Sequence, residues 1–268
     1  MRYAICFTPP IHDPLSVAAA DWLGRNVYSG DLCEQLSVAG CSAQDMAYYT
    51  AVPRRYGFHG SIKAPFHLAG DRTESALLKA MMRFAGEIGP FEIPDLEVSW
   101  LGSAFGLSPR VPCEPLTHLA ARVVQAFDEF RAPFTDGDIA RLNADKLTAP
   151  QFSNLHRWGD PFVMDEYRFH MMLTGPMTAA MRQKMEGPLR IQFAAALAQP
   201  VKVASLALFI EPGAGAPLRV HSQHPLGKLS AHKPTARFAA PSDPTTSAAT
   251  PAREVQMAKA MRRLTTGA

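Results

Sequence analysis

Two histidines occupy equivalent places in a repeated segment. Tyr, Phe, His and Pro recur at the same offsets in residues 56–66 and 167–177, and the third position after each histidine is aliphatic. Histidine is the side chain best suited to moving protons near neutral pH. One copy in each half of the chain predicts a pseudo-symmetric protein in which His59 and His170 face each other as an acid/base pair.

Both segments have the pattern of strands, in which alternate side chains share a face. Polar side chains share the histidine face of the two strands: His59, Ser61 and Lys63 in the first, His170 and Thr174 in the second. Such a set fits an anionic oxygen cluster, for which phosphate is the obvious candidate. One histidine would deprotonate the attacking group while the other protonates the leaving oxygen. Ser61 and Lys63 would stabilise the developing charge, so neither a metal nor a cofactor is expected.

A purely structural role for the two histidines is the competing interpretation. A single histidine on an apolar strand is more often a core residue than a catalyst, but burying two of them beside Ser, Lys and Thr is costly without a ligand. Arg54 precedes the first segment and is expected either to contact phosphate or to lie solvated on the surface. Arg168 shares the face of His170 and could steer an anion.

The two segments also resemble a known superfamily. His59-Gly60-Ser61 and the copy around His170 are similar to the paired H-x-[S/T] motifs of the 2H phosphoesterases, which include the 2′-5′ RNA ligase-like proteins. Residues 54–66 and 159–176 resemble the branch associated with bacterial phosphonate-utilisation operons. The resemblance spans roughly residues 2–225. It implies a bilobal α+β fold with pseudo-two-fold symmetry, two antiparallel sheets flanking a central cleft, helices outside and no metal. The implied substrate is a phosphodiester or cyclic phosphate.

One position departs from that motif. The second copy should carry Ser or Thr two residues after the histidine, but residue 172 is Met. A thioether cannot donate a hydrogen bond to phosphate. The departure predicts weakened activity or a substrate different from that of the relatives.

Composition and length limit the alternatives. The chain has 268 residues, a net charge of +3 and four cysteines without a C-x-x-C pair. These values do not indicate a nucleic-acid coat, a zinc site or a disulfide framework. The N-terminus does not resemble a signal peptide, and no apolar run approaches the ~20 residues that span a bilayer. A soluble bacterial cytoplasmic protein without membrane partners is expected.

Hydrophobic periodicity and breaker residues predict the elements. Strands are expected at 3–7, 55–66, 91–99, 102–108, 166–174 and 201–211, the last forming a hairpin with 216–222. Helices are expected from Asp13 to Gly24, at 73–88, at 115–130 and at 178–197 with a break at Gly187-Pro188, and residues 131–162 are expected to be rich in loops. Residues 1–230 would form the phosphoesterase-like domain. Residues 231–268 would be a disordered tail with a short basic helix at most.

The leading hypothesis is a metal-independent phosphoesterase that acts on a small phosphorylated substrate in phosphonate metabolism. An RNA 2′,3′-cyclic phosphodiesterase is a second hypothesis, although no interleaved basic and aromatic stripe indicates an RNA partner. A non-catalytic phosphate-binding protein is a third, which Met172 keeps open. The sequence leaves the oligomeric state undetermined.

Overall fold

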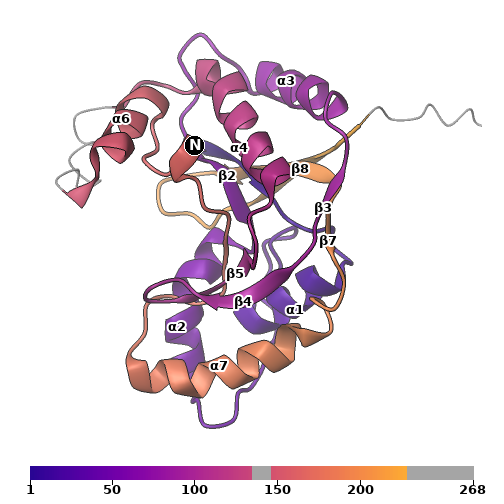
Figure 1. Cartoon of the computed structure of the whole chain (residues 1–268), viewed down its shortest axis with the longest axis vertical. Coiled ribbons are helices and arrows are strands. Elements are labelled where there is room, and N and C mark those ends of the chain that lie inside the picture. The colour runs from indigo at the N-terminus through magenta and orange to yellow at the C-terminus, as the bar shows by residue number, and fades with distance from the viewer. Residues whose placement is uncertain (135–145, 228–268) are drawn as a thin grey trace, which may run out of the picture. The chain divides into compact units, whose positions relative to one another are not determined.

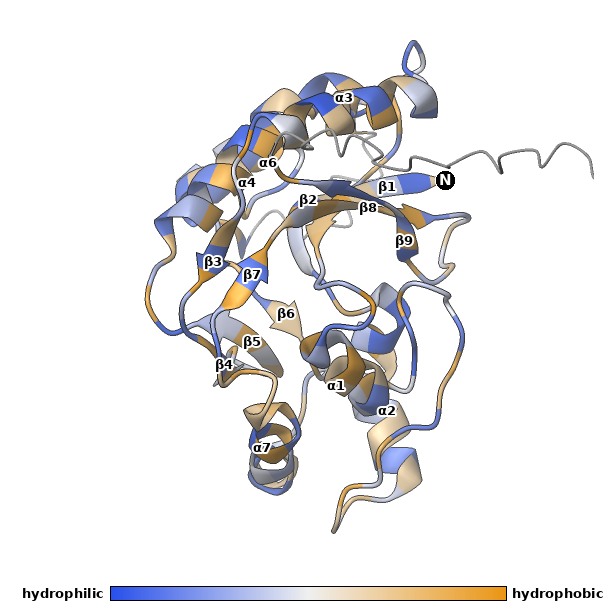
Figure 2. Cartoon of the chain, turned by 90° about the vertical axis from the view of Figure 1, so that its right-hand side faces the viewer, coloured by the Kyte–Doolittle hydropathy of each residue, from blue (hydrophilic) through white to orange (hydrophobic). Residues whose placement is uncertain are grey.

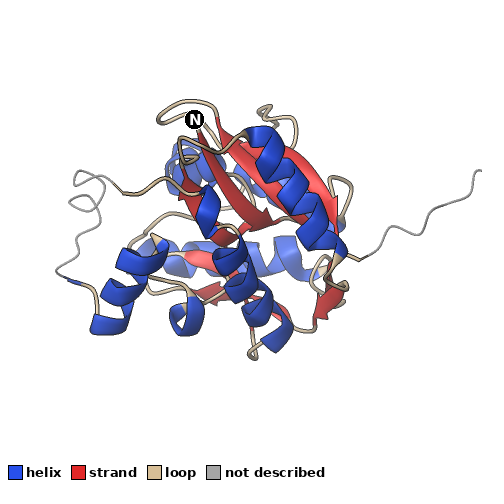
Figure 3. Ribbon diagram, turned by 90° about the horizontal axis from the view of Figure 1, so that it is seen from above, coloured by secondary structure: helices blue, strands red, loops and turns tan. Residues whose placement is uncertain are grey.

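A seven-stranded antiparallel sheet organises the computed structural model, which describes residues 1–134 and 146–227. Its strands lie in the order β4-β5-β6-β2-β1-β8-β9. Their bounds are β1 Arg2–Phe7, β2 Gly60–Phe66, β4 Leu96–Trp100, β5 Phe105–Pro109, β6 Met171–Met172, β8 Ser205–Glu211 and β9 Arg219–Pro225. A separate two-stranded sheet pairs β3 (Phe91–Ile93) with β7 (Val201–Val203). Figure 3 shows the strands in red among the helices.

This arrangement corrects one expectation. In place of two antiparallel sheets flanking a cleft, there is one large continuous sheet and one small one. The large sheet is continuous because β2 and β6 pair with each other at a single register position, Gly60 opposite Met171. The α+β class is confirmed, whereas the bilobal arrangement as a whole stays a prediction.

Six α-helices and two 3-10 turns accompany the sheets within the described residues. Their bounds are α1 Pro14–Leu23, α2 Ala43–Tyr56, α3 Glu74–Gly86, α4 Glu114–Ala126, α6 Ala149–Trp158, α7 Ala179–Ala194, η1 Asp128–Phe130 and η3 Met164–Glu166. Helices α3 and α4 lie toward one end of this arrangement, and α1, α2 and α7 lie toward the other (Figure 1).

The ends of α1 follow from their residues. The side chain of Asp13 accepts a hydrogen bond from Leu15 N, and Pro14 occupies the first turn, where its missing N–H costs nothing. Gly24 ends the helix in the left-handed region at φ 68°, which favours glycine. These were the capping residues expected from the sequence.

The strands in the middle of the sheet bury apolar side chains on both faces, and hydrophobic residues predominate in β8 (Figure 2). On β1, Tyr3, Ile5 and Phe7 belong to the main core, whereas Ala4 and Cys6 belong to a second buried cluster that also holds Phe209 of β8. Strands buried on both faces read as continuous apolar runs, as β8 does. The described residues form one compact unit. The predictions for residues 231–268 concern a part of the chain outside the described residues.

Candidate functional site

The two histidine segments meet at the centre of the sheet. Gly60 of β2 and Met171 of β6 are Cα partners, and they are also equivalent positions of the sequence repeat. An antiparallel pair centred on equivalent residues has a local two-fold axis between its strands. The repeat therefore forms a symmetric central pair of strands, in which His59 and His170 each precede their strand by one residue.

The register decides which side chains are neighbours. When the antiparallel pairing of Gly60 with Met171 is extended by one residue in each direction, His59 lies opposite Met172 and Ser61 lies opposite His170. Opposite residues of an antiparallel pair share a face of the sheet. Burial agrees with this, since His59, Ser61 and Met172 are partly buried and His170 is exposed. The residues of the opposite face are buried in the core: Phe58, Ile62, Phe169, Met171 and Leu173.

A glycine allows the second strand to pack closely on the first. A Cβ atom on Gly60 would lie 2.2 Å from the ring of Phe169, closer than any real contact. The ring of Phe169 therefore covers the backbone of β2 on the core side. It also packs against Phe7, with ring centroids 6.2 Å apart. The close approach of the two motifs depends on the missing side chain at residue 60.

Both imidazoles are held in the same way. Nδ1 of His59 lies 3.0 Å from the carbonyl oxygen of Gly57, and Nδ1 of His170 lies 2.9 Å from that of Arg168. A carbonyl oxygen only accepts, so in each ring Nδ1 carries the proton and donates. In each neutral ring Nε2 is then the unprotonated nitrogen, with a tautomer fixed by the carbonyl two residues earlier.

The two histidines differ in their surroundings. The ring of His59 lies 5.0 Å from the ring of Phe209, centroid to centroid. Burial lowers the pKa of His59 to about 4; the charge of His170 also lowers it, while the bond to Gly57 acts in the opposite direction. His59 is therefore uncharged at neutral pH, with one ring nitrogen free of a proton. His170 is exposed to solvent.

Lys63 does not share the histidine face. Cys6 lies opposite Ser61 but Ile5 lies opposite Lys63, so Ile62 is the extra residue of a β-bulge. A bulge breaks the alternation of side chains along the strand. The Lys63 ammonium is buried, with Nζ 3.3 Å from Oδ1 of Asp128. The predicted shared face of Lys63 and His59 is thus absent, and a role of Lys63 toward phosphate stays a prediction.

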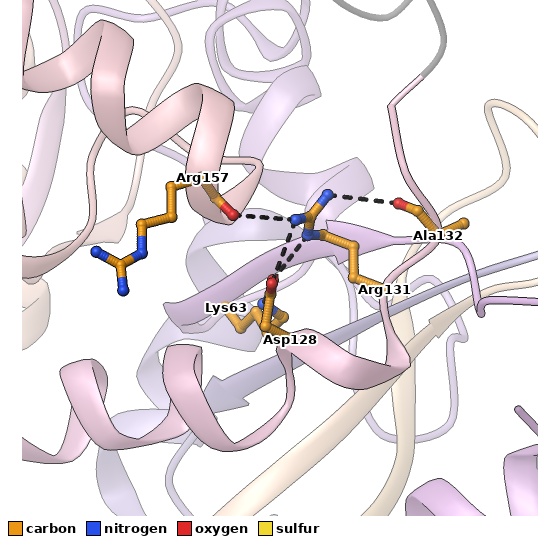
Figure 4. A network of polar contacts seen from close by, with 5 residues as sticks. All are labelled: Lys63, Asp128, Arg131, Ala132 and Arg157. Carbon is orange, nitrogen blue, oxygen red and sulfur yellow. Dashed lines mark hydrogen bonds and ion pairs between the residues drawn. The ribbon is translucent and has the colours of Figure 1, made fainter.

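Lys63 belongs instead to a charged network that joins surface segments to β2 (Figure 4). Asp128 also accepts from Nε of Arg131 at 2.9 Å, and Nη2 of Arg131 donates to the carbonyl oxygen of Arg157 at 3.3 Å. Burial lowers the pKa of Lys63, and the adjacent Asp128 carboxylate raises it. The network connects β2 with the segment after η1 and with the end of α6.

Thr174 and Arg54 also have structural roles. Thr174 is fully buried, and its Oγ1 accepts a hydrogen bond of 2.8 Å from the backbone N–H of Phe105. Arg54 donates from Nε to the carbonyl oxygen of Leu23 at 2.6 Å and from Nη2 to Oε1 of Gln35 at 2.6 Å. Thr174 has no exposed surface for a ligand, and the guanidinium of Arg54 ties α2 to the segment after α1. The structure does not support either as a substrate contact.

Arg25, a buried arginine that the sequence analysis did not select, stabilises the end of α2, the helix that precedes His59. Arg25 is only 6% exposed and donates to the carbonyl oxygens of Gly30, Arg54, Arg55 and Leu218. The carbonyls of Arg54 and Arg55 belong to the last turn of α2, where carbonyl oxygens have no hydrogen-bond partner within the helix. No local pattern distinguishes this arginine from a surface one.

Arg168 and His170 line the same cavity, of about 570 Å³. Nη1 of Arg168 donates to the carbonyl oxygens of Asp165 and Tyr167, both at 2.7 Å. Ser108 of β5 also lines this cavity. The candidate site therefore combines His59, Ser61, Met172 and His170 on the sheet with Arg168, which lines the cavity beside His170.

No group of three or more His, Cys, Asp or Glu side chains that could hold a metal ion occurs among residues 1–134 and 146–227. No helix in those ranges is long and apolar enough to cross a bilayer.

A protein-family model described as "Protein of unknown function (DUF1045)" matches residues 61–219. The chain belongs to this family. The match runs from Ser61 through β6 and therefore includes His170.

Two curated relatives carry the name ribose 1,5-bisphosphate phosphokinase PhnN. The one from Janthinobacterium sp. (strain Marseille) is 34% identical over 224 residues, which cover 81% of this chain and 49% of the relative. The one from Laribacter hongkongensis (strain HLHK9) is 32% identical over 221 residues, covering 82% and 50%. The chain thus spans about half the length of these relatives. A solved structure described as a crystal structure of a phosphoesterase is 14% identical in sequence to this chain, with a TM-score of 0.36. The match covers 84% of this chain and 98% of the chain in that structure.

Proposed function

We propose that this protein is a metal-independent phosphoesterase that acts on a cyclic phosphate or phosphodiester in phosphonate metabolism. The observation that carries the proposal is the pair of imidazoles on one face of β2 and β6, each with Nδ1 bonded to the backbone carbonyl two residues earlier. Paired histidines with fixed tautomers are suited to transfer one proton to a substrate and remove another.

His59 is the general base in this mechanism because its pKa, lowered to about 4 by burial, keeps it neutral. Its Nε2 takes a proton from a water molecule, whose oxygen forms a bond to phosphorus. His170, as the imidazolium, gives its Nε2 proton to the leaving oxygen as the old phosphorus–oxygen bond breaks. The hydroxyl of Ser61 donates to a non-bridging oxygen. The product is a phosphate monoester, and solvent restores the proton to His170 and removes it from His59.

Relatives support a phosphorylated sugar as the substrate class. Two proteins named for a phosphokinase of ribose 1,5-bisphosphate each contain a segment about one third identical to this chain. The kinase activity is not carried over, because the match covers about half of each relative and this sequence has no glycine-rich phosphate-binding loop. The resemblance of both histidine segments to the branch associated with phosphonate-utilisation operons supports the metabolic setting.

Met172 favours a second candidate function, a non-catalytic protein that binds a phosphate ligand. The register sets this thioether opposite His59, where the motif calls for a hydroxyl. A site without that donor could bind a phosphate ester without turning it over.

A turnover assay separates these functions. Small cyclic phosphates are incubated with the protein and a chelator, and hydrolysis is followed by phosphorus NMR. We expect a monoester product, abolished by His59→Ala and unchanged by Arg190→Gln, since Arg190 pairs with Glu186 on the exposed side of α7. Ligand binding without turnover would establish the binding protein. Activity that requires an added divalent ion would contradict the metal-independent mechanism.

A further inference from the structure

The two sides of the histidine pair differ in the side chains that surround them. On the side of β1 and β8, the ring of His59 lies against Phe209, and Cys6, Ala207 and Phe209 are completely buried in an apolar cluster. That side therefore places apolar side chains next to His59. The asymmetry is notable because the histidines themselves are related by the local two-fold axis of β2 and β6.

The cavity of about 570 Å³ opens on the other side, beside His170. Its wall combines the segment before β6 with the end of β5 and the first turn of α4. Apolar side chains contribute to it, among them Leu101, Val111 and Leu116. A cavity of this size accommodates a small organic body such as a sugar or nucleoside.

Two guanidinium groups line the cavity, but they differ in their charge partners. Arg110 is paired with Asp95 at 3.0 Å and with Glu97 at 3.1 Å, so its charge is balanced. Arg168 makes no ion pair with any described residue, and its two hydrogen bonds use Nη1 alone. Those bonds fix the side chain and leave its Nε and Nη2 edge for a ligand. A planar guanidinium edge matches the oxygens of a phosphate group.

We propose that the substrate carries a second phosphate group on the body attached to its leaving oxygen, and that Arg168 binds this group inside the cavity beside His170. The inference rests on the proposed function, in which His170 protonates the leaving oxygen. The leaving oxygen then points toward His170, and the body bonded to it occupies the cavity. Arg168 is accordingly a specificity-determining residue, which selects doubly phosphorylated substrates over those with one phosphate.

Binding of product analogues tests the inference without requiring turnover. Isothermal titration compares adenosine 3′,5′-bisphosphate with adenosine 3′-monophosphate at one fixed ionic strength. We expect the bisphosphate to bind wild-type protein at least about tenfold more tightly, as a charge-assisted contact provides. Arg168→Gln should remove that preference and leave the affinity for the monophosphate unchanged. Arg190→Gln, which removes a distant exposed arginine, should keep the preference.

Each contrary result has a definite meaning. Equal affinities for the two ligands in wild type, no binding of either, or a preference that survives Arg168→Gln would overturn the inference. Equal weakening of both ligands by Arg168→Gln would place the arginine at the reacting phosphate and also overturn it. Turnover of the matching 2′,3′-cyclic nucleotides, with and without a 5′-phosphate, is measured separately. A bisphosphate preference with no turnover of any cyclic phosphate would contradict the proposed function and leave the second phosphate site standing.

Discussion

The buried position of His59 predicts a pH-dependent contribution to stability. Its pKa falls from 6.5 to about 4 in the folded protein, mainly because burial disfavours the charged ring. The unfolded chain therefore binds more protons than the folded one between these two values. Stability contributed by neutral His59 is complete above about pH 6.5 and is lost as the pH falls toward 4.

The magnitude follows from the difference between the two pKa values. A difference of one unit between the folded and unfolded pKa values corresponds to about 1.4 kcal/mol of stability. The full difference for His59 therefore represents about 3 kcal/mol. Between about pH 7 and 4.5, roughly 2 kcal/mol of this is lost, and the partial exposure of the ring makes that an upper bound. The loss is a substantial fraction of the ~5–15 kcal/mol that stabilises a typical domain.

Urea unfolding of wild type and His59→Gln at both pH values measures this contribution. The wild-type profile alone is insufficient, because burial also lowers the pKa of His224. We expect the stability of wild type minus that of His59→Gln to shrink by up to about 2 kcal/mol on going from pH 7 to 4.5. His118→Gln, on the exposed side of α4, controls for the loss of a histidine as such. A difference between wild type and His59→Gln that is the same at both pH values would refute the reasoning.

Three further predictions concern the central strands. His59→Ala and His170→Ala should each lower turnover by ~10²-fold or more. The double variant should lose no more activity than either single variant, because the two residues act as a unit. Additive losses in steady-state kinetics would contradict this. Gly60→Ala should destabilise the protein by about 1–3 kcal/mol in urea unfolding, because its Cβ meets the Phe169 ring at 2.2 Å; unchanged stability would show that the ring moves aside freely. Met172→Thr should raise turnover of generic cyclic phosphodiesters by up to ~10²-fold through a restored donor. Lower activity on every such compound would show that Met172 packs against the true substrate instead.

Elements with strong local signals were predictable from the sequence. The strand at 3–7, the helix from Asp13 to Gly24 and the amphipathic helices near 73–88 and 115–130 all appear close to their expected bounds. The hairpin of β8 and β9 also forms. In each case the periodicity, the caps and the burial favour the same structure.

Two helices were missed although their caps are visible in the sequence. Ser42 and Asp45 form a capping box at the start of α2, and Thr148 and Gln151 form one at the start of α6. Because α2 runs to Tyr56, the first histidine strand begins at Gly60 and not at residue 55. Conversely, the expected break at Gly187-Pro188 is absent, since α7 continues from Ala179 through Ala194.

Which side chains lie on the histidine face was predictable only where the strands are regular. Alternation places His59, Ser61 and His170 on one face correctly, because these residues flank the single paired position of β2 and β6. It fails at Lys63, where the bulge at Ile62 intervenes. It fails at Thr174 because β6 ends at Met172 and the threonine hydroxyl accepts from Phe105. Bulges and strand ends are set by tertiary pairing, which one sequence does not reveal.

Under the proposed function, the unequal neighbours of the two equivalent histidines would allow a symmetric pair of strands to carry out an asymmetric reaction. The segments share their Nδ1 bonds and their place in the register, so the backbone alone gives both rings the same role. Phe209 of β8 packs against His59, whose burial lowers its pKa and keeps it neutral, whereas His170 lines the cavity and is exposed. Acid/base catalysis needs one ring to begin neutral and the other to begin charged. In that mechanism, the different roles of the two histidines would follow from the strands on either side of the central pair.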